Sequence, residues 1–161
     1  MRICKKCSGK NKKKLSSAKR KYYRDKRRKN INYKLSHTVS RGIYGILKGK
    51  SYYKDDLSFL NFLDYSMPEL KIHIEKQFLL PGNKWMSWNN WKKYNSKTWI
   101  DGDESTYTWN IDHIIPKSNL PYTSMRDDNF KKCWALENLR PYSAKQNILD
   151  GASRIRHKKA E

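Results

Sequence analysis

Four polar residues in the C-terminal half of the chain combine residue types and spacing that suit metal-assisted hydrolysis. Asp112 and His113 are adjacent in the apolar segment 109–116, and Asn138 and Asn147 follow, nine residues apart. Neighbouring side chains on a β-strand point to opposite faces, so the carboxylate can bind a metal ion while the imidazole acts on water. Each residue alone carries little information, because an asparagine more often caps a helix or closes a turn than binds a metal.

Phosphodiester hydrolysis needs an activated water, charge relief on the phosphoryl oxygens and stabilisation of the leaving oxygen, and a divalent ion supplies the last two. Mg²⁺ prefers oxygen ligands and keeps several waters, so the carboxylate of Asp112 and the amide oxygen of Asn147 are sufficient protein ligands. The ordinary pKa of histidine, about 6.5, suits His113 to accept a proton from water near neutral pH. The expected cofactor is therefore Mg²⁺ or Mn²⁺.

The elements expected around these residues are a strand, a loop, a second strand and a helix. Residues 108–115 are predicted as a strand that Pro116 ends, and 117–129 as a polar loop. The second strand is expected over 130–139. A Ser-x-x-Gln capping box at 143–146 predicts a helix that runs to Asp150 and stops at Gly151.

Upstream, the pattern predicts helices and an aromatic-rich connection. Helices are expected over 15–32, over the apolar stripe 35–47, over 57–63, and over 68–79 behind a Ser66–Glu69 capping box. The tryptophans and tyrosines of 83–108 are expected to form additional core, with base stacking as the alternative. The acidic segment 101–104 is expected to be a hairpin turn between Trp99 and Trp109 rather than a cation site.

Positive charge is concentrated at the N-terminal end. Lys and Arg number 36 against 15 Asp and Glu, a net charge of +21. Residues 1–50 hold 19 basic residues and one acid, +18, and residues 51–161 hold 17 and 14, +3. Such an arm is typical of a protein that binds a nucleic acid in a salt-dependent way. A membrane-surface segment is disfavoured because no wide apolar face accompanies the charges. The arginines expected to contact DNA are Arg20, Arg24, Arg27, Arg28, Arg140, Arg154 and Arg156.

Cysteine content and hydropathy place the chain among intracellular proteins. No apolar run is long enough for a membrane span, no signal-peptide core follows Met1, and three cysteines do not suggest a disulfide framework. A structural zinc needs four ligands, and the pair Cys4 and Cys7 supplies two. His37 and Cys133 are possible but unsupported completions, so an ordered zinc site is not expected.

The segments 109–116 and 133–141, together with Asn147, resemble the HNH endonucleases, also called ββα-metal or His-Me finger nucleases, and most closely a phage-type group. In that family the histidine of the Asp-His pair is the general base, the aspartate binds the metal, the middle asparagine holds the loop and the last residue completes the metal site. The resemblance implies these roles for His113, Asp112, Asn138 and Asn147. It covers about residues 35–157, with a longer His113–Asn138 interval. Many relatives have two Cys-x-x-Cys pairs that bind a structural zinc, so the resemblance implies that the single pair Cys4 and Cys7 is a remnant of a shortened zinc module.

The resemblance implies an α+β protein with a small ββα-metal catalytic unit preceded by helices and a basic arm. The expected parts are a DNA-binding arm (1–50), a helical and Trp-rich connection (51–107) and a nuclease unit with a basic tail (108–161). The expected activity is DNA cleavage that leaves 5′-phosphate and 3′-hydroxyl ends, in the host cytoplasm if the protein is phage-encoded. The alternative is an inactive HNH-fold protein that binds nucleic acid. Homing, restriction and packaging roles remain open, as do a nicking monomer and a double-strand-cutting homodimer.

Overall fold

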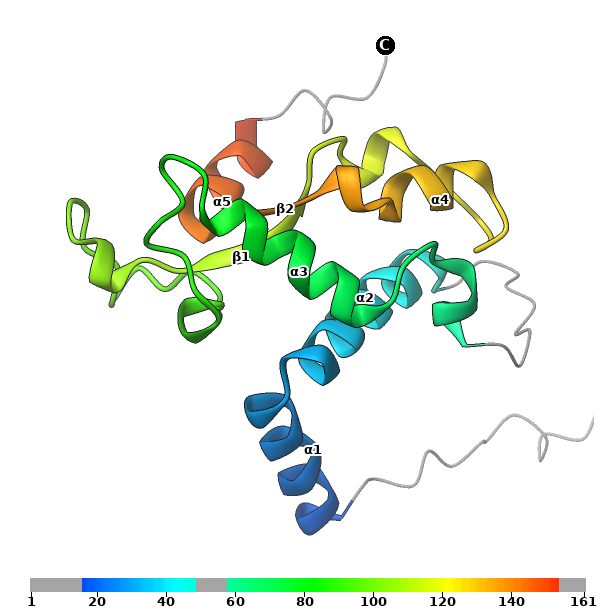
Figure 1. Ribbon diagram of the computed structural model, residues 1–161, viewed down its shortest axis with the longest axis horizontal. Coiled ribbons are helices and arrows are strands. Elements are labelled where there is room, and N and C mark those ends of the chain that lie inside the picture. The colour runs from blue at the N-terminus through cyan, green and yellow to red at the C-terminus, as the bar shows by residue number, and fades with distance from the viewer. Residues whose placement is uncertain (1–15, 49–57, 154–161) are drawn as a thin grey trace, which may run out of the picture.

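The computed structural model describes residues 16–48 and 58–153, which form an α+β fold (Figure 1). Its elements are α1 (Ser17–Lys29), α2 (Ile31–Leu47), α3 (Met67–Phe78), β1 (Trp109–His113), α4 (Asp128–Trp134), β2 (Leu139–Ser143) and α5 (Ala144–Ser153). The strands β1 and β2 pair as a two-stranded antiparallel sheet. Within the described ranges, no helix is both long enough and apolar enough to cross a membrane.

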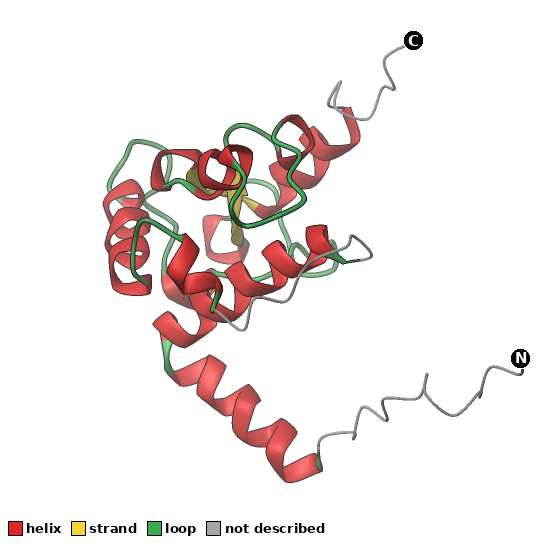
Figure 2. Ribbon diagram, turned by 90° about the vertical axis from the view of Figure 1, so that its right-hand side faces the viewer, coloured by secondary structure: helices red, strands yellow, loops and turns green. Residues whose placement is uncertain are grey.

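The helix predicted over 15–32 is present as α1, and the chain bends at Asn30 before α2 begins. The side chain of Ser16 accepts a hydrogen bond from the Lys19 amide at the start of α1. Asn30 has an extended backbone, and its Oδ1 accepts from the Tyr33 amide at 2.9 Å, so this residue caps α2. No residue of α1 is buried, and the helix projects away from the rest of the molecule (Figures 1 and 2).

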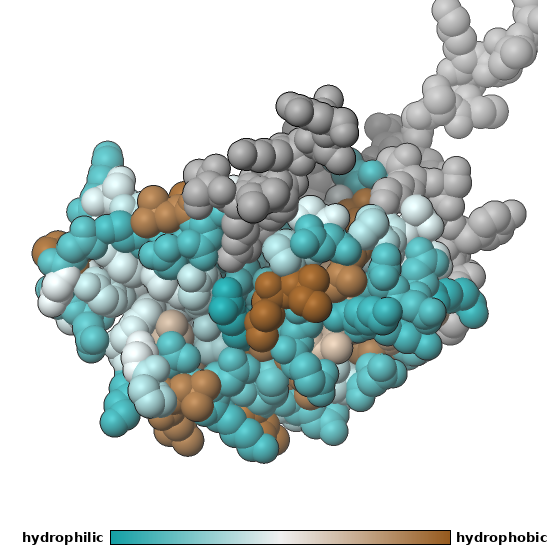
Figure 3. All heavy atoms as spheres, turned by 90° about the horizontal axis from the view of Figure 1, so that it is seen from above, coloured by the Kyte–Doolittle hydropathy of each residue, from teal (hydrophilic) through white to brown (hydrophobic). Residues whose placement is uncertain are grey.

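The core lies between α2, α3, α4 and the sheet. The predicted stripe of α2 is confirmed, since Leu35, Val39, Ile43 and Leu47 repeat every four residues and are all buried. The predicted capping box of α3 is also confirmed: Ser66 and Glu69 bond each other's backbone amides. These helices share one hydrophobic cluster with α4 and β2. Seen from above, the surface is largely hydrophilic, with separate hydrophobic patches (Figure 3).

The aromatic segment adds to this core, as predicted. Trp109 has no exposed surface, and its ring stacks on Trp91 with centroids 5.5 Å apart. The Trp109 indole donates to the Ser87 carbonyl at 2.7 Å, which ties the segment to β1. The acidic segment 101–104 is a turn, but among the described residues no strand precedes it that could pair with β1 as a hairpin. Stacking of Trp99 on Tyr107 at 4.3 Å closes this loop in place of the predicted hairpin.

The prediction of a second strand over 130–139 is wrong. Residues 128–134 form α4, and β2 begins only at Leu139. Phe130, Cys133 and Trp134 are buried at positions i, i+3 and i+4, which is the spacing of one helical face. Asp128 in the first turn and two lysines in the last turn also suit the helix dipole. These apolar residues therefore enter the core from a helix.

The predicted end of the last helix is also wrong. α5 continues through Gly151 to Ser153, and Gly151 does not adopt the positive φ that would end a helix. The capping box is only half formed: the Ser143 hydroxyl accepts from the Gln146 amide at 3.3 Å. The Gln146 side chain donates instead to Asp150, one helical turn further along, at 2.7 Å.

Candidate active site

The sheet register sets the positions of Asp112 and His113 at the C-terminal end of β1. Asp112 lies opposite Arg140 and His113 opposite Leu139 on β2. One residue beyond the strand, the Ile114 amide donates to the Asn138 carbonyl at 2.9 Å. The two candidate residues therefore lie at the end of the sheet. There, side chains from its two faces can both line the same pocket.

Asp112 is a buried carboxylate with a cationic partner. Only 7% of the residue is exposed. The Nε and Nη2 atoms of Arg140 both donate to Asp112 Oδ2, at 3.2 and 3.1 Å. Arg140 also lies over the Tyr142 ring, 4.1 Å from its centroid. Arg140, one of the arginines expected to contact DNA, thus braces Asp112 across the sheet, which fixes the carboxylate in a partly desolvated position.

His113 is buried next to an aromatic ring. Its ring meets Trp134 edge-on, with centroids 4.8 Å apart. The Nε2 atom is buried and has no hydrogen-bond partner among the described residues. Burial and the positive charge of Lys117 lower the pKa of His113 to about 3. The imidazole is therefore neutral at pH 7, the state in which it can accept a proton.

A pocket of about 300 Å³ brings together three of the four predicted residues. Its lining residues are Ile111, Asp112, His113, Pro116, Lys117, Ser118 and Asn147. Asn147 reaches it from the first turns of α5, which packs against both strands. The elements β1 and α5 thus bring together groups that are 35 residues apart in the chain.

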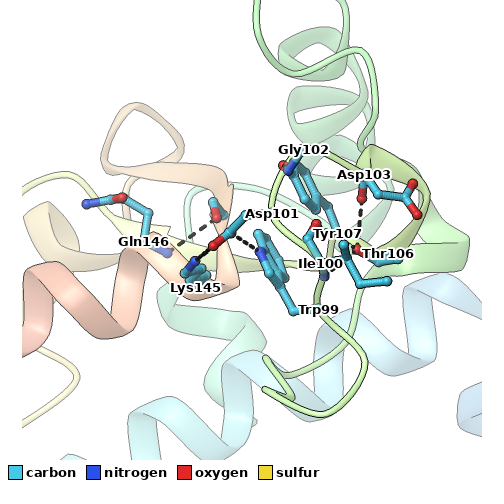
Figure 4. A network of polar contacts seen from close by, with 10 residues as sticks. Trp99, Ile100, Asp101, Gly102, Asp103, Thr106, Tyr107, Lys145 and Gln146 are labelled. Atoms are coloured by element: carbon cyan, nitrogen blue, oxygen red, sulfur yellow. Dashed lines mark hydrogen bonds and ion pairs between the residues drawn. The ribbon is translucent and has the colours of Figure 1, made fainter.

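Residues of the loop 99–107 contact the first turn of α5 (Figure 4). The ammonium group of Lys145 pairs with both carboxylate oxygens of Asp101, at 2.5 and 2.7 Å. Asp101 also accepts from the Trp99 indole at 2.9 Å, and this indole belongs to the ring stack that closes the loop. Asn147 lies two residues after Lys145, so this ion pair links the acidic turn to the helix that carries a site residue.

Asn138 lies behind the pocket as a connector between backbone segments. Its Oδ1 accepts from the Ile115 amide at 2.6 Å, and its Nδ2 donates to the Cys133 carbonyl at 2.9 Å. Nδ2 also approaches the Ile115 carbonyl at 3.3 Å. The residue is buried. It therefore joins the end of β1 to the end of α4, and it does not line the pocket.

Lys117 is a pocket residue that the sequence did not distinguish from the other lysines. Its ammonium group lies 4.8 Å from the centroid of the Trp134 ring. Burial lowers the pKa of Lys117, and the nearby Cys133 and Asp112 oppose that effect. Its position directly after Pro116 is the only sequence signal, and only the folded chain shows that this cation borders the site.

The donor set at the pocket fits a hard divalent ion. Asp112 and Asn147 offer a carboxylate and an amide oxygen, the ligand types that Mg²⁺ takes together with water. Among the described residues there is no cluster of three or more His, Cys, Asp and Glu side chains. Cys133 is a buried free thiol whose pKa burial raises to about 11, which disfavours the thiolate that zinc requires.

The remaining predicted residues lie elsewhere. Arg20, Arg24, Arg27 and Arg28 of α1 border depressions between α1, α2 and the aromatic segment. Arg154, Arg156, Cys4 and Cys7 lie outside the described residues, so their predicted roles stay predictions. Comparisons of the chain with protein-family models, with curated proteins and with solved structures found no match.

Proposed function

We propose that this chain is a divalent-metal-dependent endonuclease of the HNH, or ββα-metal, type that hydrolyses phosphodiester bonds of DNA. The observation that carries the proposal is the meeting of Asp112, His113 and Asn147 at one pocket. The resemblance of segments 109–116 and 133–141, together with Asn147, to phage-type HNH nucleases supports the same function. The excess of positive charge favours DNA as the substrate.

His113 is the proposed general base. Its imidazole is neutral and lines the pocket, and Nε2, which has no hydrogen-bond partner among the described residues, is the atom that we propose accepts the proton from water. A phosphate group in the pocket would raise the pKa of His113, because a nearby negative charge stabilises the protonated ring.

Asp112 and Asn147 are the proposed holders of Mg²⁺ or Mn²⁺. The ion, when bound, would relieve charge on the phosphate and stabilise the leaving oxygen. Arg140 keeps the Asp112 carboxylate oriented through its two N–H donors. Lys117 adds a positive charge at the pocket wall and so favours the entry of a phosphate.

The test is cleavage of a supercoiled plasmid with MgCl₂ or MnCl₂, compared with EDTA. We expect metal-dependent nicking or linearisation, and a loss of at least about 100-fold in His113→Ala, the usual effect of removing a general base. The matched control is His73→Gln, because His73 Nε2 contacts the Leu139 carbonyl and lies outside the pocket. Cleavage that survives EDTA or His113→Ala would contradict the mechanism.

The alternative, an inactive HNH-fold protein that binds nucleic acid, makes a different prediction. Such a protein would bind DNA with a steep salt dependence and would leave the plasmid supercoiled in every metal. Mapping of cut ends for 5′-phosphate and 3′-hydroxyl groups, on one strand or both, would separate a nicking monomer from a homodimer that cuts both strands.

A further inference from the structure

A basic groove runs beside the candidate active site, along α2. Two overlapping depressions of about 470 Å³ each lie between α2 and the aromatic segment 88–93, and one of them also reaches α1. The residues that they share are Lys34, His37, Thr38, Arg41, Trp91 and Lys92. A third depression continues the groove along α1 past Arg24 and Arg27. The described residues that line the three depressions come from α1, α2, the segment 88–93 and Asn110 of β1.

The residues at the base of the groove are connected to β1 by direct contacts. Lys34 donates to the Trp91 carbonyl at 2.9 Å and lies 4.0 Å from the centroid of the Trp91 ring. Trp91 in turn stacks on Trp109, the first residue of β1. A ligand on this floor would therefore be held at a fixed position relative to Asp112, three residues along the same strand.

The positive charges in the groove are not neutralised by the described protein. Arg27, Arg41 and Lys92 form no ion pair with any described acidic residue. Burial, together with Arg27 and Arg41, lowers the pKa of His37, and burial together with Lys92 lowers the pKa of Lys34. These groups face mutual repulsion, and a polyanion would relieve it.

The groove leads toward the pocket of the candidate active site. Asn110 borders the groove, and it lies on the same face of β1 as Asp112, because the two residues are two positions apart. Gly42 also borders the groove, and a Cβ atom there would lie 3.3 Å from the Lys117 ammonium group. Lys117 lines the site pocket, so the cations of the groove continue up to the site.

We propose that this groove binds the sugar-phosphate backbone of a DNA duplex and directs one strand into the candidate active site. Regularly spaced phosphates match a row of unpaired cations over a rigid floor. The binding of DNA in the groove can be tested without cleavage, whereas its role in guiding a strand rests on the proposed nuclease function.

The test is fluorescence anisotropy of a labelled duplex with the full chain in EDTA, at several KCl concentrations. The groove variant is Arg41→Ala/Lys92→Ala/Lys93→Ala, which removes three exposed cations that border the groove. The matched control is Lys76→Ala/Lys84→Ala/Lys132→Ala, which removes three exposed lysines that border none of these depressions.

We expect the groove variant to lose at least about tenfold in affinity at 0.1 M KCl. The slope of log K against log salt is negative, and its magnitude should decrease by about two to three, because each lost phosphate contact removes about 0.9. The control should change the slope by less than about one. Equal weakening in both variants, or no binding by the unmodified chain, would overturn the proposal.

Two further measurements keep the result unambiguous. Circular dichroism checks that both triple variants fold. If the groove variant does not fold, the single variant Arg41→Gln replaces it, and the magnitude of the salt slope is then expected to decrease by about one. Plasmid cleavage with Mg²⁺ is recorded separately. A groove effect without cleavage would contradict the nuclease proposal alone, and cleavage without a groove effect would contradict the groove proposal alone.

Discussion

Asp112 and His113 are neighbours in the chain, yet the fold gives them opposite surroundings. Asp112 has a guanidinium partner in Arg140, which compensates the burial of its charge. His113 has an aromatic neighbour, Trp134, and a nearby cation, Lys117, so its neutral form is favoured. At the scale of single residues, the difference between them is one of electrostatic environment, and it has a measurable consequence for stability.

The free energy of unfolding should depend on pH through His113. The folded pKa, about 3, lies below the unfolded value of about 6.5, so between these values the unfolded chain binds the additional proton. The contribution of the neutral His113 to the free energy of unfolding is therefore complete above about pH 6.5. It decreases as the pH falls toward 3, by at most about 1.4 kcal/mol per pH unit. Urea unfolding of the wild type and of His113→Asn at pH 5 and pH 7.5 measures the difference. If both proteins lose the same stability, His113 is not buried in its neutral form.

Asn138 should matter for stability more than its small size suggests. Asn138→Ala removes the acceptor for the Ile115 amide, in a partly buried hydrogen bond, and the donor to the buried Cys133 carbonyl. We expect a loss of about 2–3 kcal/mol in the free energy of unfolding, measured by urea denaturation. The control Asn119→Ala, at an exposed turn, should cost less than about 0.5 kcal/mol. Equal losses would show that Asn138 is not a structural connector.

At the scale of elements, α2 and α4 meet where the site is built. Gly42 of α2 lies against Trp134 of α4, whose ring also contacts His113. The absence of a side chain at Gly42 lets the two helices approach closely. The last helix is positioned differently, through the Asp101–Lys145 pair and the half-formed cap at Ser143. Each candidate residue is thus placed by contacts between elements.

Two glycines of α2 should respond to alanine in opposite ways. A Cβ at Gly42 would lie 2.6 Å from the Trp134 ring, so Gly42→Ala should destabilise the protein by about 1–3 kcal/mol through overpacking. A Cβ at Gly45 would meet no atom within 4 Å, so Gly45→Ala should stabilise the helix by about 0.5–1 kcal/mol. Thermal unfolding followed by circular dichroism measures both. Stabilisation by Gly42→Ala would contradict the close approach of α2 and α4.

At the scale of the whole molecule, charge and chemistry occupy different regions that the fold brings together. The net charge is +21, and ten of the basic residues lie in 17–47, where Asp25 is the only acid. α1 has no buried residue, whereas α2 is built into the common core. The basic residues therefore extend from the projecting helix α1 to α2, which packs in the core near the candidate site.

Salt should have opposite effects on stability and on DNA binding. Raising KCl from 0.05 to 0.3 M screens the mutual repulsion of the +21 chain, so the melting temperature should rise. The same change should weaken DNA binding, because counterion release becomes less favourable. Calorimetry and anisotropy on one preparation measure both. A melting temperature that falls with KCl would mean that self-repulsion does not limit stability.

The local features of the fold could be predicted from the sequence. The helices α1, α2 and α3, the cap at Ser66 and the strand ending before Pro116 follow from residues within about four positions of each other. The prediction failed at 130–139, where a short apolar run suits a strand or a helix equally well. Its i, i+3, i+4 spacing was the signal that favoured α4.

By itself, the sequence determined which groups are present and how they are spaced: a carboxylate beside an imidazole, two asparagines, and a strong positive charge near one end. The tertiary structure decided which of them share a pocket, which are buried and which cations remain unpaired. Packing brings Asn147 to Asp112, pairs Arg140 with that carboxylate, and adds Lys117. The physical reason is that burial and electrostatics depend on neighbours in space, and these neighbours lie up to tens of residues apart in the chain.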